Sequence, residues 1–393
     1  MGKEIELSTA ITDIAAGPFG SNLKVECFVP SGFPIIDGAN LKGYKVTDNI
    51  TKFVTEEKAR SLSRSIAHRG DVIVTISGTI GQIAYIPEDS LYDEYLCSQR
   101  QFRVSFDSSM VYVPYLVFYF HTFEGQNKIL SFANQTGVPA LSQPLKNFKK
   151  IRLCLPSLQE QRRIASIVET INDKIENNIK INDNLEQQAA ALFANFYDQA
   201  ETEISFTEII QILGGGTPKT SESSYWTGNI PFFTPKDVGL PYTLTTEKTI
   251  TEEGLAHCNS RLYPINTVFV TARGTVGKVG LPGVPMAMNQ SCYALVGKDT
   301  HQLLVYFYTL KAVDRLKHKA SGAVFDAITT RDFESERILK LSDADTKAFL
   351  DVVSPMFQTI LSNSIENLRL ANLRDTLLPK LMSGEIDVSD IQL

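Results

Sequence analysis

Three short segments combine residue types that could bind phosphate, cleave a phosphodiester or hold zinc. Gly274-Thr-Val-Gly-Lys278 resembles the end of a phosphate-binding loop, but Ala272 replaces the first glycine of that pattern and Val279 replaces the Mg²⁺-binding Ser or Thr. Glu56-Glu-Lys58 has the form of a nuclease triplet without a supporting acid. His257-Cys258 lacks the second, spaced pair of a zinc site. We therefore predict a tight turn between strands at 274–278, and no catalytic or metal site.

Two long heptad repeats would position the remaining loops. Steps of four and three residues alternate without interruption from Ile164 to Phe196, and again from Phe349 to Leu381. This spacing predicts two long helices that meet along one seam. Each seam position of the second helix lies 185 residues after its counterpart in the first. The seam residues are Ile164, Val168, Ile171, Ile175, Asn178, Asn182, Leu185, Ala189, Leu192 and Phe196, then Phe349, Val353, Met356, Ile360, Asn363, Asn367, Leu370, Arg374, Leu377 and Leu381.

Each seam contains two asparagines, and two interpretations of them stay open. Asn178 and Asn182, with Asn363 and Asn367, either fix the register of the helix pair at some cost in stability, or face water or a bound partner where the helices splay apart. The first interpretation predicts that replacing all four with leucine raises stability and loosens the choice of register.

The segments before the two helices also repeat. Residues 35–41 have an echo at 232–238, residues 75–81 at 271–277, and Gly137 and Phe148 recur as Gly322 and Phe333. Such direct repetition indicates two copies of one structural unit. We predict an α+β fold of two tandem pseudo-symmetric globular domains, each followed by a long α-helix. The helices should pack as an antiparallel coiled coil, because each follows its own globular half. The expected boundaries are 1–156, 157–200, 201–342 and 343–393.

Local patterns predict some elements inside the first domain. Residues 71–76 and 101–106 are β-rich runs between turns, and 112–128 has helical spacing with Pro114 in its first turn. Residues 151–155 should form a strand that Pro156 stops. Ser157, with Glu160 three residues later, should cap the first long helix.

Composition limits the class of protein. A hydrophobic fraction of 43% and a charged fraction of 21% are typical of a globular chain. The sequence contains no run of eighteen apolar residues, so no membrane span is predicted. The N-terminus lacks the apolar core of a signal peptide. Five scattered cysteines fit a reducing cytoplasm. The net charge of −6 argues against a stand-alone nucleic-acid binder, although a local basic face matters more than the total.

Several motifs resemble the specificity subunits of type I restriction–modification systems. Residues 370–386, LANLRDTLLPKLMSGEI, resemble their distal conserved region, and 155–164, LPSLQEQRRI, the start of their central conserved helix. Gly214-Gly-Gly-Thr-Pro218, with Tyr225-Trp226, resembles the opening of a target recognition domain. The resemblance covers essentially the whole chain. The second copy departs from it at 341–346, LSDADT, where the Pro and Glu-Gln signature is absent.

The resemblance implies a non-catalytic subunit whose two domains each read one half of a split sequence in double-stranded DNA. The helices would act as a ruler and dock two methyltransferase (modification) subunits, which a restriction subunit would join. S-adenosylmethionine, ATP and Mg²⁺ would be bound by those partners, with no cofactor on this chain. Base contacts are expected from polar loop residues. The candidates are Ser21, Asn22, Lys24, Gln99 and Arg100 in the first half, and Lys219, Lys236, Arg273, Lys278, Asn289 and Gln290 in the second.

Two other classes of function remain open from the sequence. A structural adaptor would use the helices for assembly and the globular halves to bind proteins, without reading DNA. An enzyme would use Glu57 and Lys58 as a nuclease, or carry methyltransferase activity itself. Sequence-specific DNA binding in the presence of a modification subunit separates the first alternative from the specificity subunit. Metal- or S-adenosylmethionine-dependent activity of the isolated chain would support the second.

Overall fold

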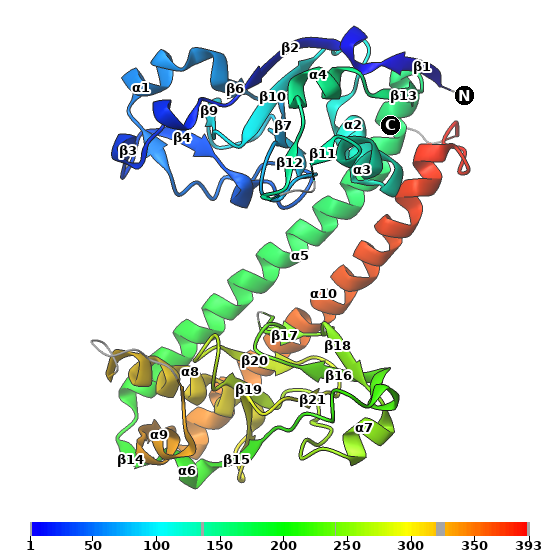
Figure 1. Ribbon diagram of the computed structural model, residues 1–393. Helices are drawn as coiled ribbons and strands as arrows, with labels where there is room; N and C mark the ends of the chain where they lie inside the picture. Colours follow the sequence, from blue (N-terminus) through cyan, green and yellow to red (C-terminus); the bar gives the residue numbers. More distant parts are fainter. Residues whose placement is uncertain (1, 135–136, 240, 320–326, 391–393) are drawn as a thin grey trace. The chain divides into compact units, whose positions relative to one another are not determined.

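The computed structural model describes residues 2–134, 137–239, 241–319 and 327–390, so Gly322 lies outside the described residues (Figure 1). The chain divides into two compact units. Unit 1 comprises residues 1–173 and 370–393, and unit 2 comprises residues 174–369. Each unit therefore contains one globular domain together with parts of both long helices.

The globular part of unit 1 contains two main β-sheets. The first has the order β2-β10-β7-β8, with all neighbours antiparallel. The second has the order β3-β5-β4-β9-β6, in which β4 and β9 run parallel. A separate antiparallel pair joins β1 to β13 beside the start of the long helix. The strands are β1 (Lys3–Glu6), β2 (Ile11–Ala16), β3 (Phe28–Val29), β4 (Phe33–Ile36), β5 (Phe53–Val54), β6 (Ile66–His68), β7 (Val72–Thr75), β8 (Ile83–Tyr85), β9 (Glu94–Cys97), β10 (Gln101–Phe106), β11 (Ala133–Asn134), β12 (Ala140–Leu141) and β13 (Arg152–Leu155).

The single helix predicted at 112–128 is wrong, because two helices occupy this segment. They are α2 (Val113–His121) and α3 (Phe123–Leu130). Thr122 adopts an extended backbone between them, and its hydroxyl accepts a hydrogen bond from the Gly125 N–H at 3.1 Å. This cap starts a new helix, whose first residue, Phe123, is 83% exposed. The other short helices of unit 1 are α1 (Glu56–Ser61) and α4 (Pro144–Lys149).

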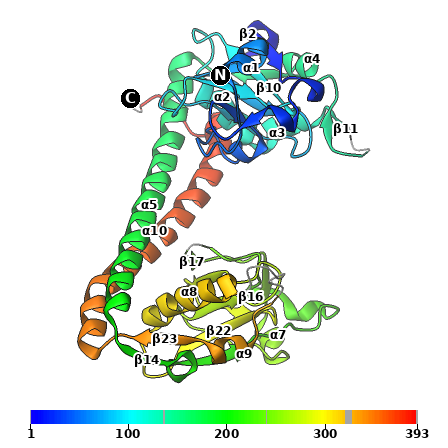
Figure 2. The same cartoon turned by 90° about the vertical axis from the view of Figure 1, so that its left-hand side faces the viewer.

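Unit 2 repeats the central part of this topology, with one strand more in its first sheet and two fewer in its second among the described residues. Its first sheet has the order β15-β22-β19-β20-β17, and its second has β18-β16-β21, with β16 and β21 parallel as β4 and β9 are. Helix α8 packs against β19, β20 and β22 (Figure 2). The strands are β14 (Thr202–Ser205), β15 (Ile210–Gly214), β16 (Trp226–Phe233), β17 (Tyr242–Thr243), β18 (Lys248–Ile250), β19 (Val268–Thr271), β20 (Val279–Pro282), β21 (Ala287–Met288), β22 (Cys292–Gly297) and β23 (Arg337–Lys340), and the helices are α6 (Phe206–Ile209), α7 (Glu252–Ala256), α8 (Gln302–Lys319) and α9 (Thr330–Ser335). The shared topology confirms the prediction of two tandem α+β domains.

The two long helices are α5 (Leu158–Gln199) and α10 (Asp343–Ser383). Ser157 and Glu160 form the predicted cap of α5: the Ser157 N–H and hydroxyl both donate to Glu160 Oε2, at 2.9 and 2.7 Å, and the Glu160 N–H donates to Ser157 Oγ at 3.3 Å. In unit 1, Arg374 Nη1 donates to Asn172 Oδ1 at 3.0 Å, and Val168 shares a core cluster with Leu381. In unit 2, side-chain hydrogen bonds join Asn178 to Asn367 and Asn182 to Asn363. The residue numbers rise along one helix as they fall along the other, which confirms the antiparallel packing.

The seam asparagines bond to one another within unit 2. Asn178 Nδ2 lies 2.7 Å from Glu366 Oε2 and 2.8 Å from Asn367 Oδ1, and Asn363 Nδ2 donates to Asn182 Oδ1 at 2.9 Å. Asn178 is 1% exposed and Asn182 8% exposed. These reciprocal bonds close only at one alignment of the helices, so they support the register interpretation over the water-facing one.

Burial along the seam follows the heptad in part. The buried seam residues are Ile164, Val168, Ile171, Asn178, Asn182, Ala189, Phe349, Val353, Ile360 and Leu381. The half-buried ones are Ile175, Leu185, Leu192, Phe196, Met356, Asn363, Asn367, Leu370, Arg374 and Leu377. In unit 2 the neighbouring Phe193, Tyr197 and Phe357 are more deeply buried than Leu192, Phe196 and Met356. The reason is that α8 also packs there: Phe193 lies 5.2 Å from Phe307 between ring centroids.

Candidate functional site

In each unit a turn that contains two glycines connects a pair of equivalent strands. Residues 76–82 join β7 to β8, and residues 272–278 join β19 to β20. Gly78 and Gly81 have φ angles of 88° and 89°, and Gly274 and Gly277 have 83° and 74°. These left-handed conformations favour glycine because it lacks a Cβ. The prediction of a tight turn, in place of a phosphate-binding loop, is confirmed.

In unit 1 this turn forms one wall of a pocket of about 570 Å³. The loop after β4 and the loop after β9 form two more walls, which the parallel pairing of β4 with β9 brings together, and Leu23, Val25 and Phe28 also line the pocket. Gln82 connects two walls: its amide donates to Gly38 O and accepts from Thr75 Oγ1, both at 3.2 Å. The polar residues that line the pocket are Asp37, Lys52, Thr75, Ser77, Thr79, Gln82, Ser98, Gln99, Arg100 and Gln101.

The charges of Asp37 and Lys52 neutralise each other in this pocket. Lys52 Nζ lies 2.7 Å from Asp37 Oδ2. Burial disfavours the Asp37 carboxylate, but the bonds from Lys52 and from the Ala39 N–H outweigh that cost and hold the Asp37 pKa below its usual value. Arg100 is exposed, and its guanidinium lies beside the turn, where a Cβ added to Gly78 would be 3.7 Å from Nη1. Arg100 is therefore the cation that this pocket offers to a ligand.

Unit 2 has a pocket of about 440 Å³ at the equivalent place. Its walls are the loops after β16 and β21 and the turn between β19 and β20. Thr271 holds that turn, because its Oγ1 donates to Thr275 O and accepts from the Lys278 N–H at 2.9 Å. The polar residues that line the pocket are Thr234, Lys236, Glu247, Lys248, Arg273, Thr275, Asn289 and Ser291.

Five of the eleven residues predicted to bind DNA line these two pockets. They are Gln99 and Arg100 in unit 1, and Lys236, Arg273 and Asn289 in unit 2. Lys236 and Arg273 are exposed, whereas Asn289 Oδ1 accepts a turn hydrogen bond from the Ser291 N–H at 3.0 Å. The structure thus brings together candidates that are more than fifty residues apart in the sequence.

The other six candidates lie outside the pocket linings. Ser21, Asn22 and Lys24 are exposed on the segment whose neighbours Leu23 and Val25 line the unit 1 pocket. Gln290 Oε1 accepts a hydrogen bond from the Thr217 hydroxyl. Lys219 is exposed, and its carbonyl accepts from the Trp226 indole N–H at 3.1 Å. Lys278 lines a different cavity, beside Lys317 of α8. Their roles stay predictions.

The sequence did not single out several residues of the pockets. Ser77 lies in the repeated segment 75–81 and Gln82 directly follows it, so alignment of the two copies could have found them. Gln101 gave no signal: it is fully buried, its Oε1 accepts from the Ser98 N–H, and its Nε2 has no hydrogen-bond partner among the described residues.

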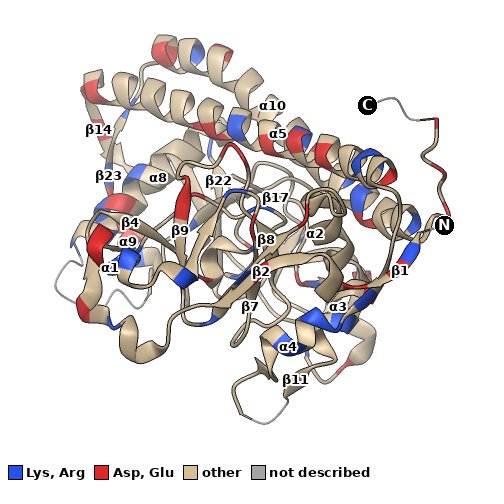
Figure 3. Cartoon of the chain, turned by 90° about the horizontal axis from the view of Figure 1, so that it is seen from above, with Lys and Arg blue, Asp and Glu red and all other residues tan. Residues whose placement is uncertain are grey.

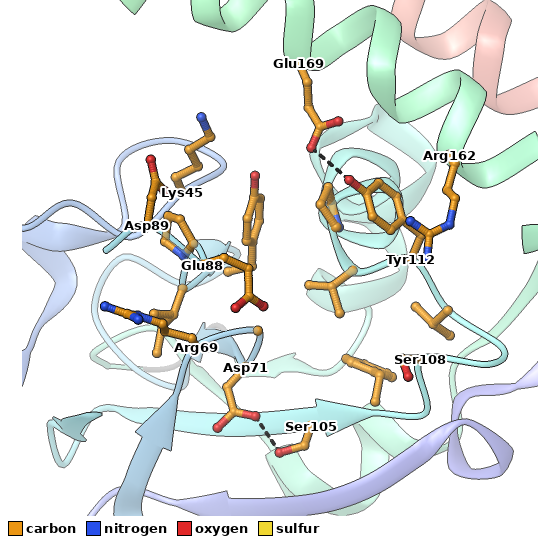
Figure 4. Close-up of a pocket in the computed structure, with 18 of the residues that line it drawn as sticks. Lys45, Arg69, Asp71, Glu88, Asp89, Ser105, Ser108, Tyr112, Arg162 and Glu169 are labelled. Carbon is orange, nitrogen blue, oxygen red and sulfur yellow. Dashed lines mark hydrogen bonds between the residues drawn. The ribbon is translucent and has the colours of Figure 1, made fainter. Parts of the chain in front are cut away.

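Unit 1 has a further cavity, of about 630 Å³, between its globular domain and the start of α5 (Figure 4). Two of its carboxylates are engaged with protein groups: Asp71 accepts from Ser105 at 2.5 Å, and Glu169 from the Tyr112 hydroxyl at 3.4 Å. Arg162 stacks over the Tyr112 ring, 4.8 Å from its centroid. These contacts tie the domain to α5 and do not form a pair of nucleophile and base.

A metal site or a reactive thiol would be a further sign of catalysis. In the part of the chain that the structure describes, no cluster of three or more His, Cys, Asp or Glu residues is arranged to hold a metal ion. Burial raises the pKa of both Cys97 and Cys292 to about 12, so these thiols are protonated at neutral pH and are poor nucleophiles. No described helix is both long enough and apolar enough to cross a bilayer.

Basic side chains gather on one side of unit 1, around α3, α4 and β1 (Figure 3). Lys146, Lys149, Lys150 and Arg152 are all exposed there. At the positions 185 residues later, unit 2 has Arg331, Glu334, Ser335 and Arg337. A net charge of −6 thus coexists with a local basic face, which is a surface suited to polyanions.

Comparisons with known proteins agree with this arrangement. The chain matches the family model described as the type I restriction modification DNA specificity domain twice, at residues 29–187 and 201–339. It is 22% identical to the type I restriction enzyme MjaIX specificity subunit of Methanocaldococcus jannaschii, over 97% of this chain and 93% of that protein. It is 23% identical to the HindI specificity subunit of Haemophilus influenzae, over 78% of this chain and 84% of that protein.

The fold also resembles a solved structure, the type I restriction–modification S subunit from M. genitalium. The TM-score is 0.61 at 13% sequence identity, covering 97% of this chain and 96% of that chain. The two matches to the family model together cover more than half of the sequence, and each falls on one globular domain with its helix or strands. The chain therefore belongs to the type I restriction modification DNA specificity family, as a specificity subunit with two recognition domains.

Proposed function

We propose that this chain selects a bipartite DNA target, each recognition domain reading one block of bases through its three-loop pocket. The observation that carries the proposal is that equivalent loops form a polar pocket in both domains of a chain from a DNA specificity family. Arg, Asn and Gln side chains on such loops match the donor and acceptor patterns of base edges. The basic face around α4 would supply sequence-independent contacts to phosphates.

The long helices would set the gap between the two blocks and dock the partners. A fixed spacer turns a distance into specificity, because half-sites must fall at one phase of a duplex that repeats every ~34–36 Å. We propose two modification subunits on these helices, which bind S-adenosylmethionine and methylate adenine, and a restriction subunit that binds ATP and Mg²⁺. The chain itself would hold no cofactor and act as a non-catalytic subunit in the cytoplasm. Exposed apolar side chains on the helices, among them Ile179, Ile181 and Leu373, would contribute to such docking.

The direct test is selection from randomised duplexes by this chain purified together with its modification subunit. We expect an enriched consensus of two short blocks around a gap of constant length. The modification subunit alone is the control and should enrich no such consensus. A complex that forms normally but shows no preference among duplexes would reject the proposal and favour the structural adaptor.

A further inference from the structure

An arginine and a serine exchange places between the two pockets. The strand registers make the correspondence unambiguous: Ile76 N–H donates to Arg100 O at 2.7 Å, and Ala272 N–H donates to Ser291 O at 2.8 Å. Arg100 in unit 1 therefore occupies the position of Ser291 in unit 2.

The second half of the exchange lies on the turn. Ser77 forms a β-bridge with Ala140, and Arg273 forms the same kind of bridge with Ala327. Ser77 and Arg273 are thus equivalent positions. Each pocket contains one arginine and one serine at this pair of positions, but the arginine extends from the loop after β9 in unit 1 and from the turn in unit 2.

Both arginines are available to a ligand. Each is exposed, and no described residue forms a hydrogen bond or ion pair with either guanidinium. The nearby lysines are engaged: Lys52 with Asp37, Lys236 with Glu247 at 3.8 Å, and Lys248 over the Trp226 ring at 5.8 Å. A free guanidinium at the wall of a polar pocket is suited to the O6 and N7 acceptors of guanine, which it can bind with two parallel hydrogen bonds.

We infer that Arg100 and Arg273 are the guanine-reading residues of their respective domains, and that they reach the base from opposite walls of equivalent pockets. This inference rests on the proposed function. It requires at least one G·C pair in each block of the target.

The test measures binding of the complex with its modification subunit to duplexes in which each base pair of the wild-type target is replaced in turn. We expect Arg100→Ser to lose roughly 10- to 100-fold discrimination at one G·C pair of one block and to leave the other block unchanged. Arg100→Lys should not restore it, since an ammonium cannot bind both acceptors in the same fork. The exchange Ser77→Arg with Arg100→Ser should restore a guanine preference in that block. Arg273→Ser should affect only the other block, and Lys42→Ala, at an exposed lysine outside the pocket, should affect neither.

The possible failures are distinguishable. A wild-type complex without any sequence preference would reject the proposed function itself. A wild-type split target with a block that lacks G·C pairs would overturn the inference about guanine and leave the function standing. The inference would also be wrong if Arg100→Ser weakened binding to all duplexes equally and reduced the salt slope by about one, because that is the behaviour of a phosphate contact.

Discussion

Phe193→Ala should destabilise unit 2 by about 3–5 kcal/mol, the usual cost of deleting a fully buried phenylalanine ring. Phe193 is 2% exposed, and its ring centroid lies 5.2 Å from that of Phe307 and 5.6 Å from that of Phe349. The substitution removes the ring where α5, α8 and α10 meet. Equilibrium denaturation followed by fluorescence of Trp226 measures the effect, since this single tryptophan of the chain belongs to unit 2.

Two control variants on the same helix make this prediction specific. Ile179→Ala removes a side chain that is 48% exposed, so the free energy of unfolding should change by no more than about 0.5 kcal/mol. Phe196→Ala, at a half-buried heptad position, should cost clearly less than Phe193→Ala. If the two substitutions lowered the free energy of unfolding equally, the prediction would be wrong. The core would then follow the heptad seam and not the three-helix junction around Phe193.

Asn182→Leu should destabilise the helix pair by about 1–3 kcal/mol, because it leaves the Asn363 amide without its acceptor. The two side chains are joined by a hydrogen bond of 2.9 Å, from Asn363 Nδ2 to Asn182 Oδ1. Asn363→Leu should cost a similar amount for the converse reason. In the double variant neither partner remains unpaired, so its stability should return to the wild-type value or exceed it. Denaturation of the four proteins, again followed by Trp226, gives the coupling energy.

The register interpretation adds a second measurement to this comparison of the wild-type protein, the two single variants and the double variant. The double variant, although stable, should populate more than one oligomeric or helix-pairing state, which size-exclusion chromatography with light scattering detects. Asn177→Leu, at an exposed neighbouring asparagine, is the matched control and should change neither readout. Additive losses in the two single variants, with no coupling, would show that the hydrogen bond across the seam does not contribute to stability.

The long helices could be predicted from sequence because their determinants are local. The heptad spacing from Ile164 to Phe196 and the Ser157–Glu160 cap require no knowledge of distant contacts. The departures have non-local causes. Phe193 is more deeply buried than Leu192 because α8 packs on that side of α5. Helix α8 begins more than a hundred residues further along the chain. The break at Thr122 was missed because a hydroxyl cap inside an apolar helical pattern gives only a weak signal.

The candidate site was only partly predictable for a related reason. Its pockets depend on parallel pairing of β4 with β9 and of β16 with β21, which sets loops far apart in the sequence beside one another. Parallel pairing leaves no short-range turn signal of the kind that marks a hairpin. Ser77 carries no chemical signal of its own, and its equivalence with Arg273, which the β-bridges establish, is what indicates a role.

The most direct test of the central claim is to map methylated adenines in DNA from a host that expresses this chain with its modification subunit. The wild-type chain should yield a split motif, two short blocks around a fixed gap. The same map is then made for a chain whose residues 1–156 are replaced by the corresponding domain of a relative. The account predicts that one block changes while the other block and the gap stay constant. A continuous motif, or an exchange that changes both blocks together, would contradict the account of two independent readers.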